Sequence, residues 1–271
     1  MADSTSDPDS TPAPGGTPAP GSAPTAHSAT VDDGVALVGT IFARVFSQLG
    51  DWRTEIAAGP TETTPAKLDE LVRSLVEPTL SADDAFLIGA GFIAAPDYVH
   101  GRDVHFAWWL GPLEANPLLG TTDQPTKLDL STRGYADYLR DFRSLEWYSI
   151  PESTHQTHIT GPYVDHLCTC DYIVTLTMPA EIDDIMIGVV GADIQVKRLE
   201  RDLLPTLLAI DRTVTLVNQV GRVMVSTDPT LAVGSILPVT PDERAESGHY
   251  DLVACPGTPF ALAVDTERRA F

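Results

Sequence analysis

Aromatic and acidic side chains that could bind a cation gather in the middle of this 271-residue sequence. The adjacent rings of Trp147 and Tyr148 come first, and Tyr163 and Asp165 follow, two residues apart. On an extended strand, residues two apart point to the same face, so Tyr163 and Asp165 are expected to share one. Asp193 closes an otherwise apolar run. If its carboxylate is buried, it needs a cationic or hydrogen-bonding partner.

These residue types favour an ammonium group over a metal ion or a phosphate. A carboxylate supplies the opposite charge, and the faces of neighbouring aromatic rings attract a cation further. Taken singly, the rings also fit ordinary core or rim positions, and Asp165 also fits a turn or a helix cap. The sequence predicts a site for a small ammonium ligand, with these candidate residues: Tyr138, Trp147, Tyr148, Tyr163, Asp165 and Asp193.

Other chemistries have less support in the sequence. His155, His158 and His166 have a spacing that a metal ion could use, but histidines in a polar loop mostly face solvent, so we expect no metal and no cofactor. The sequence has no phosphate-binding glycine loop, no Gly-x-Ser-x-Gly elbow and no Cys-x-x-Cys pair. We therefore assign no catalytic residue. The enzyme alternative is a hydrolase or isomerase that uses Asp165 and Asp193 as an acid/base pair.

Charge excludes two classes of partner. The chain has 17 Lys and Arg residues against 38 Asp and Glu residues, a net charge of −21. Such a balance opposes binding to nucleic acid or to an anionic membrane surface. The N-terminus lacks the basic start and apolar segment of a secretory signal, and the apolar run 85–96 is too short to span a bilayer. We expect a cytoplasmic protein whose cysteines, Cys168, Cys170 and Cys255, are reduced structural thiols.

The N-terminal third predicts a tail and two helices. Residues 1–32 are rich in Pro, Ala, Ser and Thr and are expected to be disordered. Apolar residues spaced by three or four then predict a helix over about 33–58. Its stripe could join two subunits of a homodimer as a coiled coil, or it could cover a sheet. Thr64 and Pro65 mark the start of a second helix, and we expect Pro78 to end it.

The remainder predicts an α+β fold of two antiparallel-sheet modules. A helical pattern over 135–145 is expected to end before Trp147, and a helix over 195–209 to kink at Pro205. Strand patterns fall at 85–94, 105–110, 127–130, 171–178, 185–194, 213–217, 222–226, 250–254 and 259–264. Short connections predict that the strands from 171 onward pair as hairpins. The first module then spans 33–209, and a smaller module spans 210–271.

The order of these motifs resembles the Cache sensor superfamily, in particular double-Cache domains, in which two PAS-like sheets stack on a long N-terminal helix. The resemblance covers residues 35–271. It rests on Trp147-Tyr148, on Gly-Pro-Tyr-Val-Asp at 161–165, on Gly-Val-Val-Gly-Ala-Asp-Ile at 188–194 and on Val-Gly-Arg-Val-Met-Val-Ser-Thr-Asp-Pro at 220–229. In amino-acid-sensing members, residues matching five of the candidates line the pocket, and the matches of the two aspartates hold the ligand's ammonium.

One departure from that family points to the ligand class. Amino-acid-sensing members place an arginine two residues before the Trp-Tyr pair to bind the ligand carboxylate, and a tyrosine five residues earlier still. Leu145 and Arg140 stand at these positions. Without the arginine, a bound carboxylate lacks a partner worth a few kcal/mol. Arg140 or Arg143 could restore the contact from a neighbouring position.

The resemblance therefore implies a cytoplasmic Cache-type sensor or binding protein for a small amine. An amino acid is the alternative ligand. Double-Cache domains usually lie outside the membrane and pass a signal to a fused output domain, and we expect neither an anchor nor an output domain in this chain. A separate regulatory protein would then read the bound state.

Overall fold

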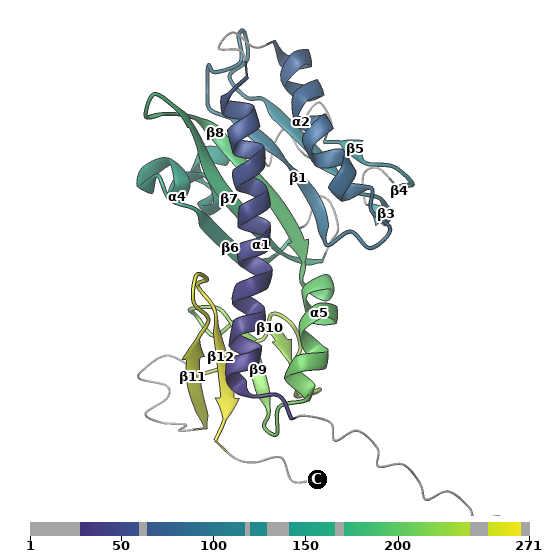
Figure 1. Cartoon of the computed structure of the whole chain (residues 1–271), viewed down its shortest axis with the longest axis vertical. Coiled ribbons are helices and arrows are strands. Elements are labelled where there is room, and N and C mark those ends of the chain that lie inside the picture. The colour runs from purple at the N-terminus through teal and green to yellow at the C-terminus, as the bar shows by residue number, and fades with distance from the viewer. Residues whose placement is uncertain are drawn as a thin grey trace, which may run out of the picture.

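The structure, a computed structural model, describes residues 28–59, 64–116, 120–128, 141–165, 171–238 and 249–266. Two main antiparallel sheets lie along one long N-terminal helix (Figure 1). The α+β architecture predicted from the sequence is confirmed. No helix within these ranges combines the length and the apolarity that a membrane span requires.

Helix α1 (Val31–Ala57) begins at a capping box. The Thr30 hydroxyl oxygen accepts from the backbone N–H of Asp33, and the Asp33 carboxylate accepts from the N–H of Thr30 at 2.8 Å. One face of α1 packs on both main sheets (Figure 1). Its buried apolar residues are Val38, Ile41, Phe42, Val45, Leu49, Trp52 and Ile56. The stripe that could have joined two subunits is thus covered by the sheets of its own chain.

The N-terminal tail ends earlier than the predicted range 1–32. Residues 1–27 lie outside the described residues. The backbone N–H of Ala29 donates to the carbonyl oxygen of Ala209 at 3.1 Å, and Thr30 caps α1. The last residues of the predicted tail therefore belong to the fold, because they satisfy backbone groups at helix ends.

Two N-terminal truncations are expected to differ in stability. Removing residues 1–27 should leave the melting temperature nearly unchanged, since that segment has little apolar surface to pack. Removing residues 1–30 also deletes the Thr30 cap and should cost about 1 kcal/mol of folding free energy. Thermal unfolding of both proteins tests this. Equal melting temperatures for the two truncations would contradict the role of the cap.

The first module is built on a six-stranded sheet with the strand order β5-β2-β1-β8-β7-β6. Its strands are β1 (Leu87–Ala94), β2 (Phe106–Leu110), β5 (Thr126–Lys127), β6 (His158–Val164), β7 (Tyr172–Ile182) and β8 (Ile185–Gln195). β7 and β8 form the predicted antiparallel hairpin, with Ile182 opposite Ile185. Strands β3 (Leu113–Asn116) and β4 (Gly120–Thr122) form a separate two-stranded ribbon.

Two helices of the first module contain prolines that we did not expect inside them. Helix α2 (Pro65–Leu80) continues through Pro78, where the sequence pattern had placed its end. Helix α4 (Glu146–Thr154) contains Pro151. Each proline lies in the last turn of its helix, where the missing N–H removes a single backbone bond. The predicted stop at Pro78 is therefore wrong.

The Trp147-Tyr148 pair also lies differently from the expectation. Both residues are in the first turn of α4, whereas the sequence pattern placed them beyond the end of a helix at 135–145. Within the described part of that range there is only the short 3₁₀ helix η1 (Phe142–Ser144). A new helix begins after it because Leu145 has the extended conformation of an N-cap.

The second module contains a four-stranded sheet with the order β10-β9-β12-β11. Helix α5 (Val196–Leu208) leads into it (Figure 1). Its strands are β9 (Val214–Val217), β10 (Val223–Ser226), β11 (Tyr250–Ala254) and β12 (Ala261–Asp265). Both predicted hairpins form, since β9 pairs with β10 and β11 with β12, each antiparallel.

Cys255 lies in the turn between β11 and β12 and is buried. Burial raises the pKa of its thiol to about 11. A thiol that stays protonated is a poor nucleophile, as expected of a structural cysteine. Cys168 and Cys170 lie outside the described residues.

Alternation along the strands gives the large sheet two different faces. Val174 and Ala192 belong to the main core, which also contains the buried face of α1. Thr175 and Asp193 point the other way, because successive strand residues face opposite sides. A second apolar cluster covers that side together with α4. We call it the α4 face, and it carries the candidate site.

Candidate ligand-binding site

A chain of hydrogen bonds on the α4 face ends at Asp193. Thr175 lies opposite Asp193 on the neighbouring strand, and its hydroxyl donates to Asp193 Oδ1 at 2.6 Å. The Tyr163 hydroxyl of β6 lies 2.6 Å from Thr175 Oγ1. Since the one proton of Thr175 goes to Asp193, the tyrosine donates to the threonine. Three adjacent strands thus hold the Asp193 carboxylate in one orientation.

The environment of Asp193 disfavours its charge. Burial raises the pKa of this carboxyl group to about 7, the hydrogen bond from Thr175 opposes the rise, and the Asp165 carboxylate adds to it. No ion pair joins Asp193 to a basic side chain among the described residues. A carboxylate in such a place is stabilised when a cation binds beside it.

Asp165 lies at the end of β6, within electrostatic reach of Asp193. Its backbone N–H donates to the carbonyl oxygen of Asp171 at 2.9 Å, which joins the two ends of the segment 166–170. The two predicted aspartates therefore do lie near each other, although one comes from a strand end and the other from within a central strand.

The two aromatic residues at the start of helix α4 both pack against Phe142, within the apolar cluster of the α4 face. The ring of Trp147 stacks on Phe142 with a centroid distance of 6.3 Å, and the ring of Tyr148 meets Phe142 edge-on at 4.8 Å. Tyr148 is fully buried, and burial raises the pKa of its hydroxyl to about 12. Three buried hydroxyls have no hydrogen-bond partner within the described ranges, those of Tyr148, Thr160 and Thr177. Buried hydroxyls are normally paired, so these can serve a bound molecule.

Two residues of the site were missed by the sequence analysis. Thr175 lies in the strand predicted at 171–178 but was not linked to Asp193, a link that only the register of the β7–β8 hairpin provides. Trp108 belongs to the apolar cluster of the α4 face, whereas its neighbour Trp109 belongs to the main core. Alternation along β2 could have separated the two rings, but not chosen which of them faces the site.

Residues just before the Trp147-Tyr148 pair decide whether a ligand carboxylate would find a basic partner. Leu145 packs against the apolar cluster of the α4 face. Arg143 is half exposed and forms an ion pair with Glu152 at 2.6 Å, so its charge is already matched. Tyr138 and Arg140 lie outside the described residues, and their predicted roles stay untested.

The histidines with metal-like spacing have other partners. His155 pairs with Glu181, and His158 pairs with Glu146 at 2.9 Å. His166 lies outside the described residues. In the part of the chain that the structure describes, no three His, Cys, Asp or Glu side chains are grouped as metal ligands would be.

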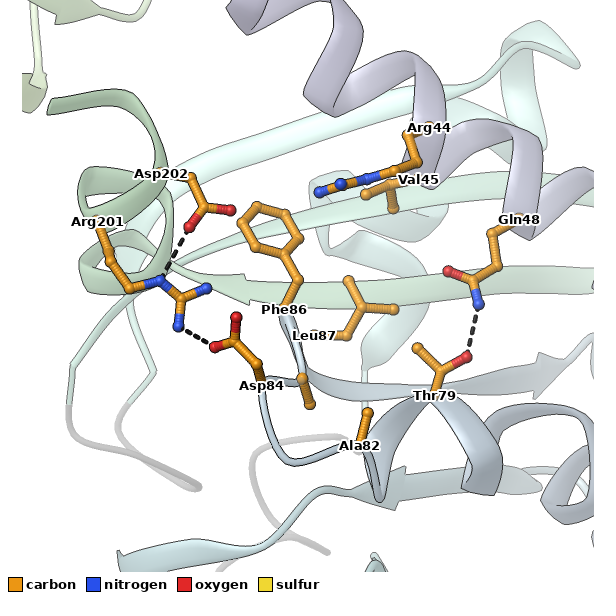
Figure 2. Close-up of a pocket in the computed structure, with 11 residues that line it drawn as sticks. Arg44, Val45, Gln48, Thr79, Ala82, Asp84, Phe86, Leu87, Arg201 and Asp202 are labelled. Atoms are coloured by element: carbon orange, nitrogen blue, oxygen red, sulfur yellow. Dashed lines mark hydrogen bonds and ion pairs between the residues drawn. The ribbon is translucent and has the colours of Figure 1, made fainter. Parts of the chain in front are cut away.

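Another hollow, of about 310 Å³, lies between α1, α5 and the start of β1 (Figure 2). Most of its polar side chains pair with one another, since Arg201 binds Asp84 and Asp202 and Gln48 donates to Thr79 at 2.6 Å. The Arg44 guanidinium lies over the Phe86 ring, 5.3 Å from its centroid. Because these groups already pair with each other, this hollow leaves fewer polar groups for a ligand than the α4 face does.

A cleft of about 330 Å³ runs along β6 at the junction of the two modules. Asn218 crosses the junction, since its side-chain amide donates to the carbonyl oxygen of Gly161 at 3.2 Å. Tyr163 and Glu146 also line the cleft. The junction is therefore adjacent to the candidate site.

Comparisons with known proteins place this geometry in a known class of fold. Residues 98–201 match the model of a family described as methyl-accepting chemotaxis protein-like, first PDC sensor domain. That range includes Trp147, Tyr148, Tyr163, Asp165 and Asp193. The first module is similar to a PDC sensor domain. A comparison with curated protein sequences gives no match.

Solved chemoreceptor structures match nearly the whole chain. The structure of "Methyl-accepting Chemotaxis protein X" has a TM-score of 0.56 at 16% identity, over 88% of this chain and 97% of its own. The ligand-binding domain of the Pseudomonas fluorescens chemoreceptor CtaA, in complex with L-valine, has a TM-score of 0.56 at 18% identity, with coverage of 88% and 94%. The sensory domain of the Campylobacter jejuni chemoreceptor Tlp3, with isoleucine bound, has a TM-score of 0.56 at 14% identity, with coverage of 86% and 88%. At these identities the likeness concerns the fold of such sensor domains.

Proposed function

We propose that this protein is a sensor domain that binds a small amine on the α4 face of its first module. One observation carries the proposal. Asp193 is a carboxyl group in a desolvating environment, oriented by Thr175 and without a basic partner among the described residues. A site of this kind gains most from a cation that arrives from solution.

The surroundings of Asp193 favour an organic cation. Oδ1 accepts from Thr175, which leaves Oδ2 for a ligand ammonium. Asp165 adds a second negative charge nearby. Trp147 and Tyr148 contribute aromatic surface on the same face, and ring faces stabilise an ammonium beyond the direct charge contacts.

An amine fits the described residues better than an amino acid does. A ligand carboxylate needs a basic partner, yet Leu145 is apolar and Arg143 is paired with Glu152. The amino-acid alternative keeps one specific support, because the similar CtaA and Tlp3 structures contain L-valine and isoleucine. Arg140 would be the basic residue for that alternative.

The proposal includes a double-Cache organisation, in which residues 33–209 bind the ligand and 210–271 form the smaller second module. Two sheets along one helix support this division. The cytoplasmic location, a homodimer and a regulatory protein partner stay predictions from the sequence. A homodimer through α1 would have to use the face of that helix that the sheets leave uncovered. Cell fractionation tests the location, and light scattering tests the dimer.

A thermal-shift screen of the purified protein against amines and amino acids tests the function. A ligand that binds the native state raises the melting temperature by mass action. We expect an amine among the hits, and isothermal titration should give one site per chain. Recovery of the ligand unchanged after long incubation is expected of a sensor. Conversion of the ligand would favour the enzyme alternative with Asp165 and Asp193 as acid and base.

Amine affinity is expected to depend on pH through Asp193. Its pKa of about 7 in the free protein means that, below pH 7, binding of the ammonium must release the proton of this carboxyl group. The affinity should therefore be about tenfold weaker at pH 6 than at pH 8, as long as the amine itself stays protonated. Titrations in two buffers with different ionisation enthalpies measure the released proton. Equal affinity at both pH values would contradict an ionised Asp193 in the complex.

A further inference from the structure

Trp108 lies closer to Asp193 than its position in the sequence suggests. It belongs to β2, and β1 separates that strand from β8 in the sheet. A Cβ atom added to Gly89 of β1 would meet Trp108 Nε1 at 3.0 Å and Asp193 Oδ2 at 3.2 Å. The indole nitrogen and the carboxylate oxygen therefore flank the same side-chain-free position.

The indole crosses the sheet because glycines make room for it. A Cβ atom added to Gly191 of β8 would lie 3.2 Å from Trp108 Cη2, at the other end of the ring system. Gly91 stands opposite Trp108 on the paired strand, and a Cβ there would lie 2.7 Å from Trp108 Cα. The ring thus extends from β2 across β1 and contacts β8 at a position next to the aspartate.

Trp108 carries a hydrogen-bond donor, its indole N–H, and Asp193 carries an acceptor, its Oδ2 oxygen. Indole Nε1–H can only donate. Asp193 Oδ1 is held by Thr175, whereas Oδ2 accepts no hydrogen bond from another described residue. Oδ2 is also the oxygen that the proposed function leaves for the ligand.

We propose that Trp108 is a positioning residue of the amine site, which fixes Asp193 Oδ2 through its indole N–H once the carboxylate is charged. The inference rests on the proposed function and adds a residue that acts through Asp193. Two donors, Thr175 and Trp108, then hold the two oxygens of the carboxylate. The ammonium meets an oriented charge and not a rotating side chain, which lowers the entropy lost on binding.

Charged and titratable groups around Asp193 influence how readily its carboxyl group ionises. Asp165, from the end of β6, repels the Asp193 charge. Tyr163 acts on it only through the Thr175 hydroxyl. On the β1 side, the side chains of Trp108 and Leu110 lie beside the Gly89 position, and neither of them titrates. Among the described residues, Thr175 is the side chain that donates to this carboxylate, and the indole nitrogen of Trp108 lies across the Gly89 position from its other oxygen.

The adjacent tryptophans of β2 provide a matched pair of variants. Trp108→Phe keeps an aromatic ring and removes the N–H on the α4 face, whereas Trp109→Phe makes the same change in the main core. Both residues are almost fully buried, at 6% and 4% exposure, so their costs in stability should be comparable. Isothermal titration uses the amine that gives the largest thermal shift with the wild type.

We expect Trp108→Phe to weaken amine binding about tenfold at pH 7, since a hydrogen bond to a charged group is lost. Its affinity should keep rising at pH values where the wild type has already reached a plateau, because the unassisted carboxylate ionises at higher pH. Trp109→Phe should change neither the affinity nor the pH profile. Equal effects of the two variants, or a wild-type pH profile for Trp108→Phe, would overturn the inference. If the wild type binds no amine, the proposed function itself fails.

A second pair of changes keeps the test independent of how well Trp108→Phe folds. Gly191→Ala places a methyl group 3.2 Å from Trp108 Cη2, and also close to Leu176 O at 3.1 Å and Thr177 Cγ2 at 3.2 Å, and should shift the ring, whereas Gly50→Ala meets nothing within 4 Å. We expect Gly191→Ala to weaken binding several-fold in the wild type and to have little further effect in the Trp108→Phe protein. Fully additive losses would show that the glycine acts without the tryptophan, against the inference.

Discussion

Replacing Asp193 with asparagine is expected to weaken amine binding by at least about 100-fold. The change removes the negative charge that the Thr175 hydroxyl holds in a fixed orientation within the sheet, and loss of one partner of a desolvated ion pair typically costs about 3–5 kcal/mol. The amide keeps the shape of the side chain, and its oxygen can still accept from the Thr175 hydroxyl. The loss should therefore come from charge and not from misfolding.

The stability of Asp193→Asn relative to wild type should depend on pH, because of the raised pKa of Asp193 in the folded protein. That pKa lies at about 7 in the folded protein, above its ordinary value of 3.8. The folded state thus retains a proton that the unfolded chain gives up, and stability falls as pH rises from about 4 to 7. Asparagine does not titrate. Relative to wild type, Asp193→Asn should be more stable at pH 8 than at pH 4 by roughly 4 kcal/mol.

Isothermal titration and urea unfolding at the two pH values measure both effects. Asp202→Asn is a suitable control, because that carboxylate pairs with Arg201 in the other hollow (Figure 2). It should leave amine binding unchanged. Wild-type affinity in Asp193→Asn would remove Asp193 from the site, and Asp165→Ala should also weaken binding, by a smaller factor than Asp193→Asn.

Leu145→Arg is expected to shift the ligand preference from amines to amino acids. Wild type should bind an amine more tightly than the α-amino acid with the same side chain, since the amino acid must desolvate a carboxylate without an assured partner. An arginine at position 145 supplies that partner, and a charge-assisted hydrogen bond of about 1.5–3 kcal/mol corresponds to a gain of about tenfold or more for the amino acid. The affinity for the amine should change little or decrease.

Two further variants make this result specific. Leu145→Met keeps an apolar side chain of similar size and should leave the preference unchanged. Arg143→Leu should also leave it unchanged, because Arg143 is engaged by Glu152. Tighter binding of the amino acid than of the amine by wild type would contradict the amine proposal. A loss of that binding in Arg143→Leu would then identify the missing carboxylate partner.

Local sequence patterns predicted most helices and strands of the described residues, but they did not include α4 or the strands β3, β4 and β6, and they ended α2 too early at Pro78. Short connections predicted three antiparallel hairpins, and all three form. Pro78 and Pro151 nevertheless lie inside helices. A proline removes only one bond in a last turn, and tertiary packing of the remaining residues outweighs that loss.

Site residues that stand out by their type in a local pattern were predicted from the sequence. Site residues that come together only through the pairing of strands were missed. Asp193 stood out because a carboxylate in an apolar strand needs a partner. Trp108 did not, since it comes from a strand two places away in the sheet and lies near Asp193 only because both flank Gly89. The pairing of Arg143 with Glu152 likewise joins the 3₁₀ helix η1 to α4, which residue spacing alone did not predict.

The sequence by itself therefore determined most of the helices and strands, the amphipathic stripe of α1 and the choice of Asp193 as a carboxylate that needs a partner. The periodicity of the sequence predicts which side of a helix or strand is buried, but it does not predict which other element covers that side. Only the tertiary structure decided that this stripe packs on the chain's own sheets, that Thr175 and Trp108 flank Asp193, and that glycines leave room for the indole. These contacts depend on strand order and register, which long-range packing selects from many arrangements that share the same local pattern.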